Sequence, residues 1–211
     1  TKDYEDAEFA LSLEVDYLAL SYVQTGSDVK IAQELIKKHH SKAKIISKIE
    51  KPLAIQNLEE IVQLSDALMV ARGDMALETK ASIVPIYQQK ITRLARQYQK
   101  PVIVATQMLE SMIDNPRPTR AEVSDVGNAV FDQVDAVMLS AESATGKYPV
   151  EAVATLTEVT HSVEQHPDYK NYIKIDWSHL KEDMEISAIA SSAASIAYRI
   201  AAKAIIVCTA S

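Results

Sequence analysis

Short aliphatic runs alternate with helical patterns along most of the chain, and this alternation restricts the possible folds more than any other feature of the sequence. Buried strands separated by helices of this length form βαβ units, which build a parallel sheet. We therefore expect an α/β fold, either a closed (β/α)8 barrel or an open doubly wound sheet. The runs expected to be buried strands are residues 17–20, 45–49, 67–70, 102–105 and 136–139, and the expected helices are 27–39, 57–64, 83–98, 119–131 and 149–165.

Helix start signals agree with these boundaries. Asn57 with Glu60, and Thr119 with Glu122, have the spacing of a capping box, in which two side chains bind backbone amides at the helix start. Pro149 suits the first helical turn, where its missing N–H costs no hydrogen bond. The sequence thus predicts where three of the helices begin.

Polar residues at the ends of the strands favour the barrel. Nearly every aliphatic run stops at one, and these residues are Ser21, Lys48 with Glu50, Arg72 with Asp74, Thr106, and Ser140 with Glu142. In a barrel all strand ends meet on one rim, where barrel active sites are built. An open sheet gathers only the few ends nearest its switch point. We expect a parallel (β/α)8 TIM barrel, of which about five βα units are present.

The alternation of strands and helices stops after Gln165. We expect a domain boundary near His166, with residues 1–165 forming a partial catalytic barrel and residues 166–211 the truncated beginning of a C-terminal α/β domain. Five units are fewer than a barrel needs and the first residue is Thr1, so both ends of the chain look cut.

The second segment has its own pattern. An Ala/Ser-rich helix is expected at 186–202, and the aliphatic run at 204–208 is expected to be a strand. Cys208 lies in that run, which predicts a buried strand cysteine.

The composition is that of an ordinary globular protein of 211 residues, 47% of them hydrophobic. Its formal charge of -7 argues against nucleic acid or an anionic membrane as a partner, because both attract clustered positive charge.

No apolar run is long enough to span a bilayer, and the first residues do not resemble a secretion signal. A single cysteine fits a reducing compartment, so we expect a cytoplasmic protein. An anionic ligand would then need a few local cations or a metal ion.

Lys48 and Glu50 lie two residues apart at the end of the second run, so strand alternation puts both on one face. A lysine and a carboxylate would then share the barrel mouth. A structural ion pair is the alternative interpretation.

The third run stops at Arg72, Gly73 and Asp74. Gly73 permits close approach of a ligand, and Asp74 adds a second carboxylate beside Glu50. Two carboxylates from neighbouring strand ends are a typical grip for Mg2+ or Mn2+. A strand-ending turn with a solvated Asp74 is the alternative, and for Arg72 a structural salt bridge is expected rather than an anion site.

Thr106 follows the fourth run. Its hydroxyl can donate to a substrate oxygen or relay a proton through water, and it can equally cap the following helix. The loop 115–122 carries two prolines and two arginines, and such a loop serves either the site or a subunit contact.

Taken together, these segments closely resemble the pyruvate kinase family. The matching stretches are 45–50, 69–74, 101–130, 139–142 and 148–153. The resemblance spans about residues 1–165 and continues weakly beyond them. It implies a glycolytic phosphotransferase that moves the phosphoryl group of phosphoenolpyruvate to ADP, giving pyruvate and ATP.

The resemblance also implies a role for each candidate residue. Lys48 is the cation that faces the transferred phosphoryl group, while Glu50 and Asp74 hold the divalent metal. Gly73 and Asp74 offer backbone amides to phosphoenolpyruvate, and Thr106 lies beside the carbon that receives a proton. A homotetramer and a K+ requirement are further implications, although the family's K+ ligands have no counterpart in this chain.

Some family features differ or are missing. Gln24, Ala76, Ala141 and Ser143 replace the usual residues, which puts the affinity for the nucleotide in question. The first barrel strands and the lid domain have no counterpart here, so we expect no turnover from the isolated 211 residues.

Two other interpretations remain open. One is a lyase acting on phosphoenolpyruvate or pyruvate on a related barrel, which would need no phosphoryl-facing Lys48. The other is a non-catalytic assembly fragment whose helix 119–131 packs against a partner subunit.

Overall fold

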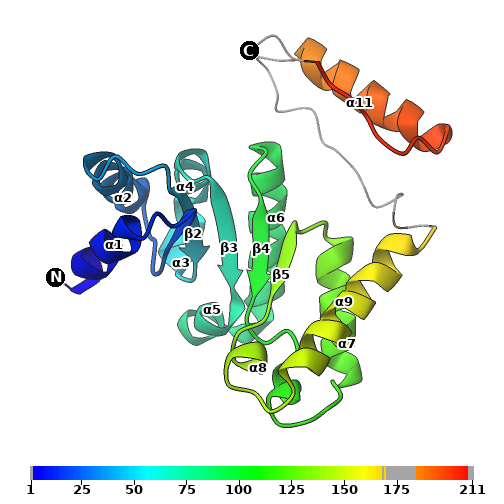
Figure 1. Ribbon diagram of the computed structural model, residues 1–211, viewed down its shortest axis with the longest axis horizontal. Coiled ribbons are helices and arrows are strands. Elements are labelled where there is room, and N and C mark those ends of the chain that lie inside the picture. The colour runs from blue at the N-terminus through cyan, green and yellow to red at the C-terminus, as the bar shows by residue number, and fades with distance from the viewer. Residues whose placement is uncertain (1, 168, 170–183, 209–211) are drawn as a thin grey trace. The chain divides into compact units, whose positions relative to one another are not determined.

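The computed structural model describes residues 2–167, 169 and 184–208 of the chain (Figure 1). The chain divides into two compact units, residues 1–173 and 174–211. The predicted boundary near His166 lies close to this division. That the two segments belong to separate domains stays a prediction. Among the described residues, no helix combines the length and apolar character that a membrane span requires.

The first unit contains a parallel sheet of five strands in the order in which they occur along the chain. The strands are β1 (Tyr17–Leu20), β2 (Lys44–Ile49), β3 (Ala67–Ala71), β4 (Val102–Ala105) and β5 (Ala136–Met138). A doubly wound sheet reverses its strand order at a switch point, whereas each strand of a barrel pairs with the next one in sequence. The order β1-β2-β3-β4-β5 therefore confirms the predicted barrel architecture, with five of its strands present.

The five helices that the sequence predicts for this unit are present, together with helices that it does not predict. Their bounds are α1 (Lys2–Ser12), α2 (Gly26–Lys38), α3 (Pro52–Gln56), α4 (Leu58–Leu64), α5 (Arg72–Glu78), α6 (Val84–Gln97), α7 (Arg120–Phe131), α8 (Ala141–Ala144) and α9 (Pro149–Gln165), with 3-10 turns η1 (Ala81–Ile83) and η2 (Glu110–Ile113). Helix α2 contacts α4, and α4 contacts α6, so these consecutive crossover helices pack side by side. The second unit contains α11 (Met184–Arg199), where a helix at 186–202 is predicted.

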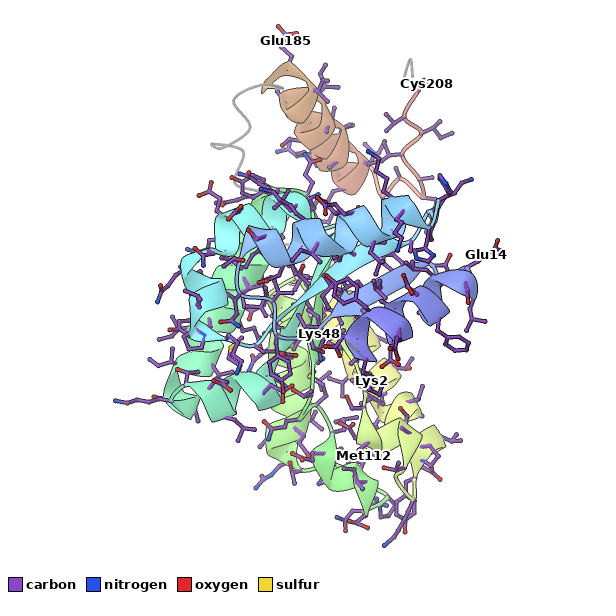
Figure 2. All side chains as sticks on the ribbon, turned by 90° about the vertical axis from the view of Figure 1, so that its left-hand side faces the viewer. Lys2, Glu14, Lys48, Met112, Glu185 and Cys208 are labelled. Carbon is purple, nitrogen blue, oxygen red and sulfur yellow. The ribbon has the colours of Figure 1, made fainter. Side chains whose placement is uncertain are left out.

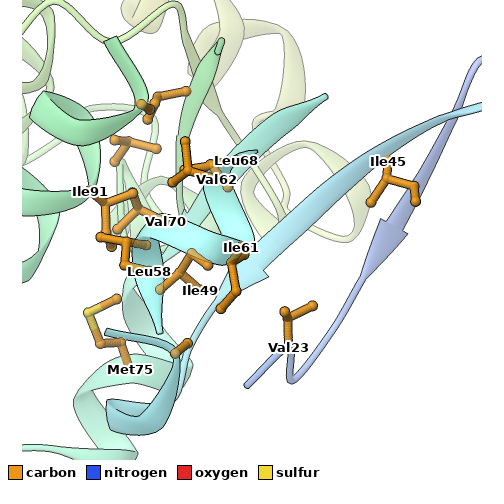
Figure 3. Packing of buried hydrophobic residues seen from close by; sticks show 14 of the residues in the cluster. Val23, Ile45, Ile49, Leu58, Ile61, Val62, Leu68, Val70, Met75 and Ile91 are labelled. Carbon is orange, nitrogen blue, oxygen red and sulfur yellow. The ribbon is translucent and has the colours of Figure 1, made fainter. Parts of the chain in front are cut away.

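The hydrophobic core joins the middle strands to their helices (Figure 3). Ile49 on β2 and Val70 on β3 are both fully buried. Leu58 and Ile61 on α4, together with Ile91 on α6, pack in the same cluster. The side chains that the strands present to their helices thus form one continuous apolar layer, which holds the strand ends in fixed positions.

All three predicted helix starts are confirmed, but only one of the two predicted capping boxes forms. The Thr119 side chain accepts a hydrogen bond from the Glu122 amide, and the Glu122 carboxylate accepts one from the Thr119 amide, so α7 has a capping box. Pro149 is the first residue of α9. The capping box predicted for Asn57 and Glu60 is wrong, because the Asn57 amide group donates to the carbonyl oxygens of Gln24 and Leu53 instead.

The prediction that every strand is buried is wrong for the outer two. Residues of β1 and β5 are half-buried or exposed, because each of these strands has only one neighbour in the sheet. The middle strand β3 is buried along its whole length.

The strand predicted at 204–208 is also absent from this described segment, which has no regular structure. A strand requires a pairing partner for its backbone, and none of the five sheet strands pairs with this segment. Cys208, predicted to be buried in that strand, is exposed.

Helices α1, α3, α5 and α8 were not predicted. Helix α5 follows β3 and α8 follows β5, and both lie at the carboxyl end of the sheet (Figure 1). Gly73 and the β-strand propensity of the preceding residues obscure the start of α5 in the sequence. Helices α5 and α8 form part of the rim on which the candidate site lies.

Candidate active site

Lys48 and Glu50 meet at the carboxyl end of β2, as strand alternation predicts. Lys48 Nζ lies 2.9 Å from Glu50 Oε1 and donates to Ser21 Oγ at 2.8 Å. Ser21 directly follows β1, and the pairing of Leu20 with Ser47 brings it level with Lys48. Figure 2 marks Lys48 among the side chains of this region. The lysine side chain keeps 23% of its surface exposed, so its ammonium group remains accessible at the rim.

Glu50 is fully buried, and its two carboxylate oxygens differ in their surroundings. Oε2 accepts a hydrogen bond from the Tyr22 amide at 2.9 Å. Oε1 lies beside the Lys48 ammonium but receives no aligned hydrogen bond. A buried carboxylate oxygen without a hydrogen-bond donor is costly unless a cation satisfies it. Oε1 therefore has the chemistry of a metal ligand as well as that of an ion-pair partner.

Gly73 and Asp74 lie in the first turn of α5, immediately after β3. Asp74 is partly exposed, so its carboxylate is accessible to a ligand. The structure replaces the alternative of a simple strand-ending turn with a short helix. Within the described part of the chain no three His, Cys, Asp or Glu residues gather as a metal cluster. A divalent ion held by Glu50 and Asp74 stays a prediction, with water and substrate oxygens completing its shell.

Thr106 directly contacts Gly73. The Gly73 amide donates to Thr106 Oγ1 at 2.7 Å, and that hydroxyl donates to the Ala105 carbonyl at 2.6 Å. The helix-capping alternative for Thr106 is wrong, because no helix begins at this residue and its hydroxyl binds a neighbouring strand end. The hydroxyl oxygen marks a position where the Gly73 amide can meet an acceptor oxygen.

The sheet register explains why residues far apart in sequence meet here. Ile49 pairs with Val70, which places Glu50 level with Ala71, and Ala71 pairs with Ala105. The residues that follow these pairs leave the sheet at one level of the rim. At this rim the structure brings Lys48 into contact with Glu50, and Gly73 into contact with Thr106.

Arg72 makes the structural salt bridge that the sequence favours. Its Nη1 lies 2.5 Å from Asp125 Oδ2, and its Nη2 donates to the Thr106 carbonyl at 2.8 Å. The side chain is almost completely buried between α5 and α7. Its hydrogen-bonding capacity serves the protein interior rather than a ligand.

Sequence reasoning missed the role of Glu142. This residue of α8 is buried, and its carboxylate accepts hydrogen bonds from the backbone amides of Leu109 and Ser140. It therefore links the loop after β4 to the end of β5. A carboxylate three residues beyond an aliphatic run was the available signal, but the link to Leu109 spans 33 residues.

A cavity of about 870 Å3 lies at the other end of the sheet. It is lined by residues around the amino ends of β1 and β2, including Tyr17 and Lys44. None of the candidate residues lines it.

Comparison with known proteins agrees with this geometry. Residues 1–153 match the family model described as the pyruvate kinase barrel domain. A pyruvate kinase of Agrobacterium vitis is 45% identical over 210 residues, which is 100% of this chain and 43% of that protein. A pyruvate kinase of Mycobacterium intracellulare is 52% identical over 165 residues, which is 78% of this chain and 35% of that protein.

A solved structure shows the same fold. The crystal structure of a pyruvate kinase from Cryptosporidium parvum superposes with a TM-score of 0.85 at 38% identity, covering 96% of this chain and 43% of that one. The chain thus spans less than half the length of these relatives. Sequential parallel strands, a shared rim and these matches together establish that the chain belongs to the pyruvate kinase family, whose barrel domain it represents in part.

Proposed function

We propose that this chain forms part of a metal-dependent phosphotransferase that moves the phosphoryl group of phosphoenolpyruvate to ADP, giving pyruvate and ATP. The observation that supports this most directly is the Lys48–Glu50 pair at the strand end, beside an accessible rim. Membership of the family supports the same reaction.

Lys48 would provide the positive charge for phosphoryl transfer. This step depends on alignment and on charge stabilisation at the equatorial oxygens rather than on covalent help from the protein. Ser21 and Glu50 hold the lysine from two sides, so its ammonium group is oriented before a substrate arrives. An oriented cation stabilises the transition state without reorganisation during the reaction.

Glu50 and Asp74 would hold Mg2+ or Mn2+. Glu50 Oε1 supports this assignment because it is buried, receives no aligned hydrogen bond and has only the Lys48 ammonium beside it. When bound, the ion supplies positive charge to the phosphoryl and enolate oxygens. It also offsets the negative charge of an acidic protein near an anionic substrate.

Thr106 would act at the protonation step, and Gly73 would bind the substrate. The Gly73 amide, now bonded to Thr106 Oγ1, would donate to a carboxylate oxygen of phosphoenolpyruvate. Release of that amide would leave the hydroxyl oxygen free to accept from a water, and rotation of the hydroxyl away from the Ala105 carbonyl would let it donate to the substrate. The same contact therefore links substrate binding to the orientation of the proton-relaying group.

The remaining features of the proposal come from the family. We place the protein in the cytoplasm as a homo-oligomer, a tetramer by analogy with the family, with K+ as a second cation. Phosphoenolpyruvate, ADP, ATP and pyruvate are its small-molecule partners.

Replacement of Lys48 tests the function. A full-length chimaera, in which this chain replaces the matching segment of the Agrobacterium vitis relative, provides a complete barrel. Lys48→Met should lower phosphoryl transfer by on the order of a thousandfold or more, while Mn2+ binding persists. Lys44→Met is the matched control, because Lys44 begins the same strand at its opposite, exposed end.

The same experiment separates the competing functions. A lyase that handles phosphoenolpyruvate or pyruvate needs no phosphoryl-facing lysine, so an unchanged rate of pyruvate formation in Lys48→Met would reject the kinase proposal. If the chain is instead a non-catalytic assembly fragment, the unsubstituted chimaera should show no phosphoryl transfer.

A further inference from the structure

Two consecutive residues after β4 have an unusual backbone conformation. Thr106 has φ of 68° and Gln107 has φ of 53°, both in the left-handed region. Such a conformation is unfavourable for residues other than glycine, and more so for a β-branched threonine. The turn keeps this conformation only if its surroundings hold it.

One buried side chain supplies much of that support. The Arg72 guanidinium donates from Nε and Nη2 to the Thr106 carbonyl at 3.2 and 2.8 Å, and from Nη2 to the Gln107 carbonyl at 3.1 Å. Asp125 on α7 binds the remaining arm of the fork at 2.5 Å. Only 7% of Arg72 is exposed, so its guanidinium group is largely shielded from competing water.

Arg72 also affects the position of the Gly73 amide, which contacts Thr106. It directly precedes Gly73, whose amide donates to Thr106 Oγ1 at 2.7 Å. A β-carbon at Gly73 would lie 3.3 Å from that hydroxyl oxygen, so the two residues are already in close contact. Arg72 thus holds Thr106 through its side chain and Gly73 through the main chain.

We infer that Arg72 is a positioning residue, which fixes the Thr106 hydroxyl against the Gly73 amide and thereby sets the efficiency of the protonation step. The catalytic half of this inference rests on the proposed function. The geometric half rests on the contacts alone. A planar guanidinium can bind two carbonyls and a carboxylate together, whereas a lysine ammonium of the same charge cannot reproduce that fork.

Amide hydrogen exchange at Gly73 tests the geometry without any catalysis. In the 211-residue chain, and in the chimaera, Thr106→Val removes the acceptor and defines the exchange rate of the unprotected amide. Arg72→Lys should raise Gly73 exchange toward that rate, by about fivefold or more, the scale of one lost hydrogen bond. Asp125→Asn, a milder change that leaves Arg72 in place, should raise it less.

Arg93→Lys on the exposed face of α6 is the matched control and should leave Gly73 exchange unchanged. Unchanged Gly73 exchange in Arg72→Lys would overturn the inference. So would a Thr106→Val variant that exchanges no faster than the unsubstituted chain.

The catalytic half is measured in the chimaera. Arg72→Lys should slow the exchange of pyruvate methyl protons with deuterated solvent by about tenfold or more, since small misplacements are costly in catalysis. The KM for phosphoenolpyruvate should change less than this exchange rate, because Lys48 and the Gly73 amide that would bind the substrate are both still present. Equal loss in both measurements would indicate a merely structural role. If the unsubstituted chimaera transfers no phosphoryl group but Gly73 exchange responds as expected, the proposed function fails and the geometry stands.

Discussion

The proposal that this site binds a divalent metal ion depends on the buried carboxylate of Glu50. One oxygen is satisfied by the Tyr22 amide and the other has only the Lys48 ammonium beside it. Burying a carboxylate in this way is unfavourable unless positive charge compensates it. The environment of Glu50 is therefore better suited to binding a cation than to stabilising the fold.

In the chimaera, Glu50→Gln should weaken Mn2+ binding by about tenfold or more. Mutations at metal sites commonly reduce metal affinity by this amount. Glutamine keeps the acceptor for the Tyr22 amide, so the local backbone should remain in place. Electron paramagnetic resonance of free Mn2+ measures the affinity. Glu78→Gln, which neutralises the carboxylate paired with Lys51 on the surface, is the control. Equal affinity in Glu50→Gln and the control would remove Glu50 from the metal site.

At the level of single elements, the first turn of helix α7 contains Glu122, whose carboxylate accepts several hydrogen bonds. Glu122 accepts hydrogen bonds from the amide and hydroxyl of Ser111 at 2.7 and 2.5 Å, and from the amide and hydroxyl of Thr119. Partial burial opposes ionisation, but these hydrogen bonds outweigh it and lower the pKa of Glu122 below its ordinary value of 4.5. The helix start and the loop after β4 are thus joined by one ionised group.

This depressed pKa predicts a pH dependence of stability. The stabilisation is present above the ordinary pKa of about 4.5 and is lost as the pH falls through the lower pKa of the folded state. Glu122→Gln should lower the free energy of unfolding by about 1 kcal/mol at pH 7. The difference should shrink below pH 4.5, as measured by urea unfolding at several pH values. A difference that stays constant with pH would show that ionisation of Glu122 contributes nothing.

Aspartates set the register at the amino ends of the strands. Asp66 exchanges hydrogen bonds with Ile45, and Asp135 does the same with Val102, using its own amide and one carboxylate oxygen in each case. Each aspartate directly precedes a strand and holds the first residues of the strand beside it. A register shift by one residue would turn every side chain of the strand to the opposite face of the sheet. These hydrogen bonds therefore help to place the rim residues.

Asp135→Ala should reduce the free energy of unfolding by about 1–3 kcal/mol, since it leaves the buried Val102 amide without an acceptor. Asp135→Asn keeps an acceptor oxygen and should lose less. Urea unfolding of both variants decides the matter. Similar losses in the two variants would show that the hydrogen bond to Val102 is not the cause.

At the scale of the whole molecule, the sheet has two free edges. Strands β1 and β5 each pair on one side only, and free backbone groups at such edges promote association. We expect the 211-residue chain to associate and to show no turnover in a coupled assay for pyruvate. Light scattering should give a mass above that of one chain, and Ala19→Lys on the exposed side of β1 should reduce it. Turnover by the unsubstituted chain would show that these residues suffice for a working site.

The fold was largely predictable because aliphatic runs and helix starts are local signals. The predicted starts and ends of β1 and β4 coincide with the observed ones, and α7 begins at its predicted capping box. The same local reasoning failed at 204–208, where a strand-like sequence has no partner in the sheet. It also missed α5, since a helix with a glycine in its first turn is held by tertiary contacts rather than by propensity.

For the candidate site, local sequence patterns identify the residues at the rim, because strand alternation and the ends of strands depend on neighbouring residues. They place Lys48 and Glu50 on one face, and the structure confirms their contact. Three other features become apparent only in the folded chain. Thr106 contacts Gly73, Arg72 supports a left-handed turn, and Glu142 links two loops at the rim. These contacts join residues 33 or 34 positions apart, and their geometry depends on strand register and backbone conformation, which no local pattern encodes.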